Sequence, residues 1–330
     1  MGEFIFWTCY VFIIGLCIGS FLNVVVLRGL SGESIVLPPS HCTKCNHKLA
    51  WYDNIPVLSY LMLLGKCRYC KEKISIQYPL VELFTGLTFA GIFYKFAHFG
   101  FSMNILCLMI AASLLIVIAV TDIKEKVILT AHTYILAVLG LIYNFFNFAG
   151  SNNTKIHFFA FGFDISIYQT FIYSILGLIA GFCVMNTLAW FCKLITKKDC
   201  FGDGDAYITG SLGAFFGIAN IIVIFILSII IWGVLCIPSF LYKLFKEKDF
   251  KLLSTLVLFC VAAFLFAVGE YFDVFDSNLF HWFAYLLVAC IGLYCCKLLI
   301  ASIKQGSKLM VIPFGPALVF AAFIVLFVLF

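Results

Sequence analysis

Charged side chains are scarce in this sequence of 330 residues. Asp, Glu, Lys and Arg together make up 11% of it, hydrophobic residues make up 64%, and the mean hydropathy is +1.12. A soluble globular domain is about half apolar and about a quarter charged. The composition therefore excludes a soluble domain and indicates a protein that crosses a membrane several times.

The N-terminus lacks the basic residues that precede the apolar core of a secretory signal peptide. It carries Glu3 instead, and the apolar stretch that follows runs to about Leu27. Since a cleaved signal peptide begins with a positively charged segment, we interpret residues 1–27 as an uncleaved first transmembrane helix.

Only one sizeable block is polar, about Arg28–Gln77, and the rest of the chain consists of apolar runs joined by short connections. Because these runs are apolar all round, their length identifies the spans, at roughly 20 residues each. The sequence predicts an all-α polytopic membrane protein with about ten transmembrane helices and a small cysteine-rich cytoplasmic domain after the first helix. Residues 150–169 are predicted to form a loop with Asn and Ser that holds one aromatic piece. The spans after the first are expected at about 78–96, 103–121, 127–148, 170–195, two within 206–242 divided near 217–220, 252–268, 280–300 and 311–330.

The distribution of Lys and Arg predicts the orientation. If the polar block is cytoplasmic and the spans alternate, all of the 21 basic residues except Lys95 and Lys155 fall on the cytoplasmic side. Cytoplasmic loops of membrane proteins carry such an excess of positive charge. We therefore expect both termini to lie outside, and Asp122 and Asp205 to lie at the same cytoplasmic face.

These two aspartates stand at the ends of apolar spans. Asp122 ends the third, and Asp205 follows the segment Gly202-Asp203-Gly204 that opens the sixth. A carboxylate at such a position is costly unless it lines water or takes part in chemistry. Two carboxylates at one face can share a proton, so that one activates water and the other protonates a scissile carbonyl. The pattern predicts an aspartyl dyad, although each aspartate alone could simply end a helix. Nearby carboxylates are alternatives: Asp199, Asp203 and Glu125.

Four of the 15 cysteines have metal-ligand spacing. Cys42-Thr-Lys-Cys45 and Cys67-Arg-Tyr-Cys70 form C-x2-C-x21-C-x2-C, which predicts a structural Zn²⁺ held by four thiolates. Redox-active pairs are the alternative, but a reducing compartment favours a metal. His41 and His47 are interpreted as bystanders.

Two further marks are weaker. Glu82 lies just inside the second predicted span and either faces a cytoplasmic pocket or is a helix-start carboxylate favoured by the helix dipole. Pro313-Phe-Gly-Pro316 opens the last span, where proline and glycine bend the entry to the helix and small residues permit close packing.

Together these motifs resemble those of the bacterial type IV prepilin peptidases, a GxGD aspartic peptidase family with leader peptidase and N-methyltransferase activity. The matching blocks follow one another along the chain: Gly19–Val25, His41–Gly86, Thr121-Asp122, Gly202–Asp205 with Leu212-Gly-Ala214, and Pro313–Pro316.

The resemblance implies that Asp122 and Asp205 are the catalytic pair, supported by Gly202, Asp203 and Gly204. The substrates would be prepilins and pseudopilins of type IV pili and type II secretion, cut after the glycine that ends a short basic leader. The new N-terminus, usually phenylalanine, would then be methylated with S-adenosylmethionine. The tetracysteine loop and Glu82 belong, by the same resemblance, to the part associated with methylation.

The resemblance further implies an enzyme of the bacterial inner membrane that contacts lipid and binds no nucleic acid. The domains would be residues 1–27, 28–77 and 78–330, with 252–300 as an inserted helix pair. The chain departs from the family pattern at Leu129, Thr130 and Tyr207. Three other functions stay open: a peptidase without methylation, a non-catalytic membrane assembly factor, and a transporter whose aspartates carry protons.

Overall fold

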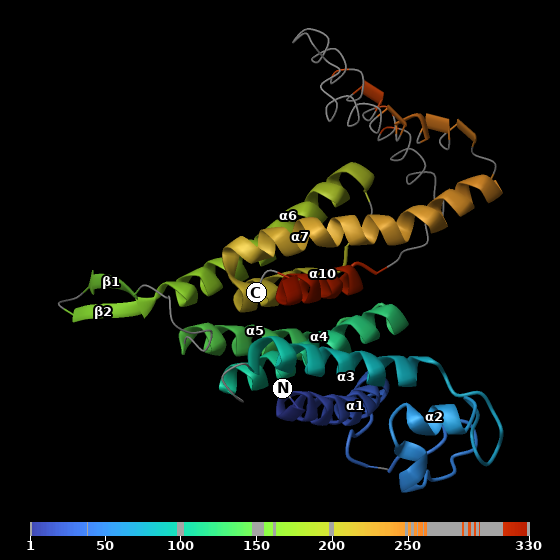
Figure 1. Cartoon of the computed structure of the whole chain (residues 1–330). Coiled ribbons are helices and arrows are strands. Elements are labelled where there is room, and N and C mark those ends of the chain that lie inside the picture. The colour runs from blue at the N-terminus through green and yellow to red at the C-terminus, as the bar shows by residue number, and fades with distance from the viewer. Residues whose placement is uncertain are drawn as a thin grey trace. The chain divides into compact units, whose positions relative to one another are not determined.

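The computed structural model describes residues 2–37, 39–97, 102–146, 155–160, 163–197, 201–247 and 313–328, with isolated helical residues between 250 and 297. These residues are mostly helical (Figure 1). The elements are α1 (Gly2–Ser31), the 3-10 helix η1 (Trp51–Asn54), α2 (Leu58–Met62), α3 (Gln77–Phe96), α4 (Met103–Glu125), α5 (Thr130–Phe145), β1 (Lys155–Ala160), β2 (Phe163–Tyr168), α6 (Gln169–Thr196), α7 (Asp203–Glu247) and α10 (Gly315–Val328).

The chain divides into two compact units. The first comprises Met1–Asn186, Gly202–Ile229 and Pro313–Phe330, and the second comprises Thr187–Phe201 and Ile230–Ile312. Every described candidate site residue belongs to the first unit. The structure describes only part of the second unit, which contains the predicted insertion, so the spans predicted at 252–268 and 280–300 lie almost entirely outside the described residues.

Four described helices are long and apolar enough to cross a membrane: α1, α4, Thr170–Ile195 of α6 and Asp203–Cys236 of α7. Helices α5 and α10 are apolar but shorter, and α3 carries Glu82 and Lys95, which lower its hydropathy. The predicted helical membrane fold is confirmed, whereas the predicted count of about ten spans is not.

Residues 150–169 differ from the predicted loop, and from a strictly all-α fold. Strands β1 and β2 form a two-stranded antiparallel sheet that pairs Lys155 with Tyr168 and Ala160 with Phe163. The segment is rich in Phe, Ile and Tyr, which favour strands. The sequence interpretation noted the aromatic piece but gave weight to the Asn and Ser residues and assigned no strand.

Helices α1 and α3 pack backbone to backbone through small residues. A Cβ added at Gly15 would lie 2.8 Å from Gly86 Cα, and one added at Gly19 would lie 2.7 Å from Glu82 Cα. Close approach of this kind is how apolar helices associate in a membrane, where burial of apolar surface provides no driving force. Gly19 therefore fixes α1 at the level of Glu82 on α3.

Helix α7 is kinked at Gly217, whose φ of 80° and ψ of 172° interrupt the helix. This agrees with the predicted division near 217–220. A break leaves carbonyl groups without their helical donors, and Asn144 of α5 compensates by donating to Ala214 O at 3.2 Å and to Phe215 O at 3.1 Å. Ser174 of α6 also donates to Ala214 O. The kink is thus held by both neighbouring helices.

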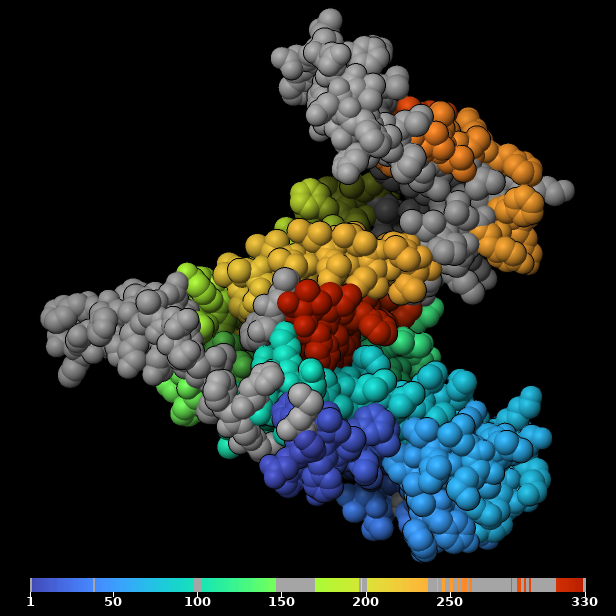
Figure 2. Space-filling view, in the orientation of Figure 1, coloured from blue at the N-terminus to red at the C-terminus, as the bar shows by residue number. Residues whose placement is uncertain are grey.

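Helix α10 packs against α3 and α4 although it comes last in the described chain (Figure 2, red beside cyan). Lys95, near the end of α3, donates to Leu326 O at 3.1 Å and to Phe327 O at 3.0 Å. A cation at the C-terminal carbonyls satisfies acceptors that the helix leaves free and complements its dipole. Lys95 therefore anchors the far end of the helix that begins at Gly315.

Candidate functional site

Asp122 lies in the last turn of α4 and is 4% exposed. The helix ends at Glu125. Lys126 caps it in a left-handed conformation with φ of 55° and donates its N–H to Asp122 O at 2.9 Å. The helix thus runs slightly beyond the predicted end at residue 121. As a result, Asp122 is held on a rigid helical turn and not on a loop.

Asp205 lies in the first turn of α7 and is 7% exposed. The N–H of Gly202 donates to Asp205 Oδ2 at 3.3 Å, and the N–H of Asp205 donates to Gly202 O at 3.1 Å. Gly204 allows the start of α7 to approach the turn between α4 and α5, because a Cβ there would lie 2.7 Å from Ile128 Cδ1. The two glycines have separate roles: Gly202 orients the carboxylate, and Gly204 permits the approach.

The fold brings Asp122 and Asp205 together from positions 83 residues apart in sequence. The Asp205 carboxyl lies close enough to Asp122 for their charges to repel each other when both are ionised. Of the alternatives, Asp203 and Glu125 are exposed, and Asp199 lies outside the described residues. A buried pair of carboxylates is the arrangement that allows one to be protonated while the other is ionised.

Gly315, the first residue of α10, borders this pair. A Cβ at this position would collide with Asp122 Oδ2 and would lie 3.2 Å from Ile208 Cδ1, one turn beyond Asp205. Gly315 is therefore part of the site, although the sequence interpretation assigned Pro313–Pro316 only to the helix entry. The Pro313–Pro316 motif marked this position in the sequence. Its contact with Asp122 could not be predicted, because it depends on packing between distant segments.

The four predicted metal ligands form one cluster. The sulfur atoms of Cys42, Cys45, Cys67 and Cys70 all lie within 4.8 Å of one another, and those of Cys42 and Cys70 are 3.9 Å apart. Four sulfurs held at about 2.3 Å from a tetrahedral zinc ion are separated by about 3.8 Å. The cluster therefore fits a Zn²⁺ site made only of thiolates.

The two cysteine pairs lie on equivalent loops, shifted by 25 residues from Cys42 to Cys67. In the first loop the Cys42 N–H donates to His47 O and the Asn46 N–H donates to Cys42 O. In the second the Cys67 N–H donates to Glu72 O and the Lys71 N–H donates to Cys67 O. Asn46 and Lys71 both have positive φ, at 55° and 61°. Each loop is thus a zinc knuckle that points two thiols in the same direction.

The thiols of the cluster hold their protons unequally. Burial raises the pKa of Cys42, but hydrogen bonds from the backbone of Cys45 and Lys44 and from neighbouring thiols outweigh it and lower this pKa to about 7. A hydrogen bond from the backbone of Glu72 lowers the pKa of Cys70. Burial and hydrogen bonds with the other three thiols outweigh it and raise this pKa to about 11. Cys42 thus readily forms the thiolate that binds a metal, whereas the metal must displace the proton of Cys70.

The two histidines do not extend the cluster. The His47 ring lies against the Tyr69 ring at 3.6 Å between centroids, and His41 Nδ1 is 3.1 Å from Pro39 O.

A contact that the sequence interpretation missed joins the second knuckle to η1. Arg68 donates to Asp53 Oδ1 at 2.9 Å from Nε and 2.8 Å from Nη2.

Glu82 faces the cysteine-rich segment. Its Oε2 accepts the Val57 N–H at 2.7 Å, and the side chain is 7% exposed. Val57, just before α2, has a φ of 61°, which is strained for a β-branched residue. Nearby, Asn23 of α1 donates to Tyr78 O at 3.2 Å. Glu82 thus attaches the segment that carries the metal cluster to α3.

Two family models match the chain. The Bacterial Peptidase A24 N-terminal domain matches residues 13–96, and the Type IV leader peptidase family matches residues 109–237. No solved structure matches.

Curated proteins called prepilin leader peptidase/N-methyltransferase are similar to about two thirds of this chain. One from Myxococcus xanthus is 35% identical over 206 residues, which is 62% of this chain and 55% of that protein. One from Klebsiella pneumoniae is 30% identical over 217 residues, 64% of this chain and 86% of the relative. One from Xanthomonas campestris pv. campestris is 31% identical over 245 residues, 67% of this chain and 78% of the relative.

Proposed function

The chain belongs to the type IV leader peptidase family, and from that premise we propose that it removes the leader from prepilin-like precursors and then N-methylates the new N-terminal residue. The observation that carries the peptidase half is the buried pair Asp122 and Asp205, joined at the ends of α4 and α7. The names of the relatives in three bacteria support both halves.

In the proposed reaction the two carboxyl groups hold one proton between them. The ionised carboxylate takes a proton from a water molecule, whose oxygen attacks the carbonyl carbon of the leader's terminal glycine. The protonated carboxyl donates its proton to the carbonyl oxygen, which gives a tetrahedral diol. One carboxyl then donates a proton to the amide nitrogen while the other accepts a proton from a diol hydroxyl. The C–N bond breaks, and the pair again holds one proton, without a covalent intermediate.

We place this reaction at the cytoplasmic face of the bacterial inner membrane. A prepilin leader is short and basic and is followed by an apolar helix, so its cleavage site lies where a membrane helix meets the cytosol. Asp122 and Asp205 stand at the ends of their helices, and the excess of basic residues in the polar block supports the same side. Both termini then lie outside, and the partners are prepilins, pseudopilins and lipid, with no nucleic acid.

We assign methylation to S-adenosylmethionine as donor and to the segment 28–77 with Glu82. S-adenosylmethionine supplies the methyl group, and the four cysteines hold a structural Zn²⁺ that stabilises a segment with little apolar core. The catalytic domain is then 78–330, preceded by the helix 1–27. The contact from Glu82 to Val57 supports a physical link between the two parts.

The decisive experiment is mass spectrometry of a prepilin that is co-expressed with the wild-type protein or with Asp122→Asn or Asp205→Asn. We expect leader loss and a mass gain of one methyl group with the wild type, and a drop in cleavage of at least about 100-fold with either variant. Glu33→Gln, which changes an exposed carboxylate away from the pair, is the matched control. Leader loss without methylation would identify a peptidase only, and an uncleaved prepilin with the wild type would favour an assembly factor.

A further inference from the structure

The cysteine-rich segment exposes large apolar side chains where a cytosolic domain would bury them. They belong to η1, α2 and the residues just after α2. The exposed fractions are 79% for Trp51, 51% for Leu58, 62% for Leu61, 73% for Met62 and 85% for Leu64. Large apolar side chains exposed together in one short segment indicate a contact with a partner or a membrane. We call these five residues the apolar tip.

The contacts of α1 and α3 place the apolar tip at membrane depth. Val57, directly before α2, hydrogen-bonds to Glu82, and Glu82 lies level with Gly19 on α1. Gly19 precedes Arg28, the first charged residue of α1 after Glu3, by nine residues, or about 13 Å along the helix. Glu82 likewise follows the start of α3 at Gln77 by five residues, or about 7.5 Å.

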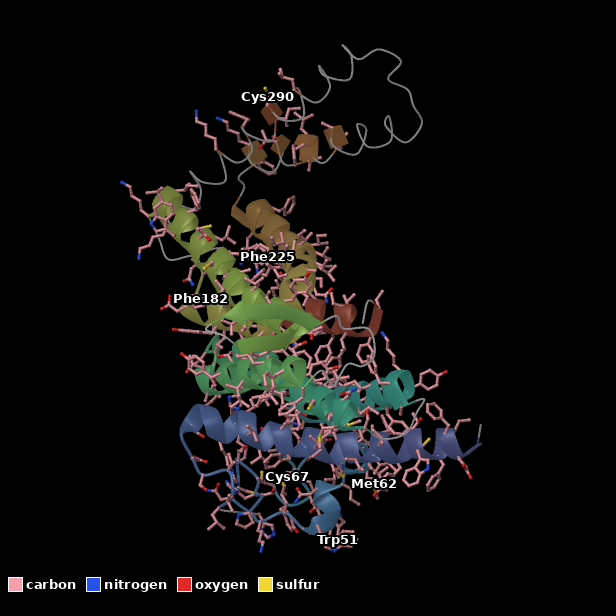
Figure 3. All side chains as sticks on the ribbon, turned by 90° about the vertical axis from the view of Figure 1, so that its left-hand side faces the viewer. Trp51, Met62, Cys67, Phe182, Phe225 and Cys290 are labelled. Carbon is pink, nitrogen blue, oxygen red and sulfur yellow. The ribbon has the colours of Figure 1, made fainter. Side chains whose placement is uncertain are left out.

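The side-chain view agrees with this depth. Figure 3 shows Trp51 and Met62 at the level of the middle of α1, nearer to its N-terminal end than Cys67. The tip therefore points along the apolar part of α1, and the metal cluster lies toward its polar end. Interfacial segments bury their apolar side chains about 5–10 Å below the headgroups, close to the depth obtained from the helix contacts.

The charges of the same segment match the headgroup layer of an anionic membrane. Residues 28–77 contain seven basic residues and only Glu33, Asp53 and Glu72 as acidic ones, and Arg68 pairs with Asp53. Lys44, Lys66, Lys71 and Lys73 are exposed around the knuckles. Lys and Arg near a bilayer surface are attracted to anionic lipids, and Trp favours the interface itself.

We propose that the apolar tip is a membrane anchor, inserted in the cytoplasmic leaflet beside α1, with the zinc knuckles resting on the anionic headgroups. The apolar tip contacts the lipid bilayer and not a protein helix. The anchor fixes the distance of the metal cluster from the membrane. This role does not depend on the Asp122 and Asp205 pair.

The test uses Trp51 as a depth reporter in the full-length protein, reconstituted in vesicles of phosphatidylglycerol and phosphatidylcholine. A variant keeps Trp51 and has phenylalanine at the other four tryptophans: Trp7, Trp190, Trp232 and Trp282. We expect lipids brominated on the acyl chain to quench most of its fluorescence and aqueous iodide to quench little. A variant that keeps only Trp7, which is 53% exposed on α1, is the lipid-embedded reference, and Trp51→Phe in the reporter background gives the blank.

Strong iodide quenching of Trp51 without quenching by brominated lipid would overturn the anchor. So would protection from iodide that develops only after a prepilin is added, which would make the tip a substrate-binding surface. Protection that depends on protein concentration would point to a second copy and would overturn it as well. A yield of membrane-inserted reporter variant equal to that of the wild type shows that it is folded, so this result is read separately from the peptidase proposal.

Discussion

Gly315→Ala tests whether α10 sets the position of the catalytic pair. The added methyl group would collide with Asp122 Oδ2 and would lie 3.2 Å from both Asp122 Cγ and Ile208 Cδ1. Overpacking of a buried site costs about 1–3 kcal/mol. Rotation of the Asp122 side chain relieves it most easily, because the other neighbour, the Ile208 side chain, is fully buried. A shift of about 1 Å at a catalytic group lowers turnover by about 100-fold.

The effect should fall on activity and not on folding. Alanine is favoured over glycine in a helix by about 0.5–1 kcal/mol, so α10 itself gains from the change. We expect the kcat for prepilin cleavage to fall by roughly 10- to 100-fold, while the yield of membrane-inserted protein and its zinc content stay unchanged. The assay is leader release from a purified prepilin in detergent or vesicles.

Gly233→Ala is the matched control, because it makes the same change in helix α7 at a position with nothing within 4 Å. It should cleave at the wild-type rate. If Gly315→Ala also cleaved at the wild-type rate, Gly315 would not determine the position of Asp122. A loss of membrane-inserted protein equal to the loss of activity would assign the effect to folding and would equally refute the reasoning.

The metal site, the leader contact and the carboxylate on α3 give three further predictions. Cys42→Ser combined with Cys45→Ser should lose the single zinc detected by elemental analysis and reduce methylation more than cleavage, whereas Cys17→Ser should keep the metal. Zinc retained in the double variant would contradict a four-thiolate site. Asp203→Asn should raise the KM more than it lowers the kcat, because an exposed carboxylate at the start of α7 can attract a basic leader, and added salt should narrow the difference. Equal KM values at low salt would exclude this role. Glu82→Ala should lower the ratio of methylated to cleaved product more than Glu82→Gln, which retains an oxygen acceptor for the backbone N–H. Equal losses in both variants would mean that the carboxylate charge acts directly.

The sequence was most informative where the chemistry is local. The spacing of Cys42 and Cys45, and of Cys67 and Cys70, predicted a cluster because a knuckle turns within a few residues. The kink at Gly217 was foreseen because the apolar run is too long for a single span. For Asp122 and Asp205 the orientation predicted a shared membrane face, and the family resemblance supplied their roles, which stay predictions.

Packing between distant segments could not be read in the same way. The contact of Gly315 with Asp122 and that of Lys95 with the end of α10 join residues about 190 and 230 positions apart. No local pattern encodes such pairs. The hydrogen bond from Val57 to Glu82 requires a strained φ that the sequence does not announce.

The position of α10 also imposes an order on assembly. Ribosomes deliver Asp122 and Asp205 to the membrane well before Gly315, so for a time the pair exists without the helix that borders it. Under the proposed mechanism the complete site forms only when this late helix docks, with Lys95 donating to its last carbonyl groups. On that proposal, a newly inserted chain does not cleave the membrane segments around it until its own synthesis has passed α10.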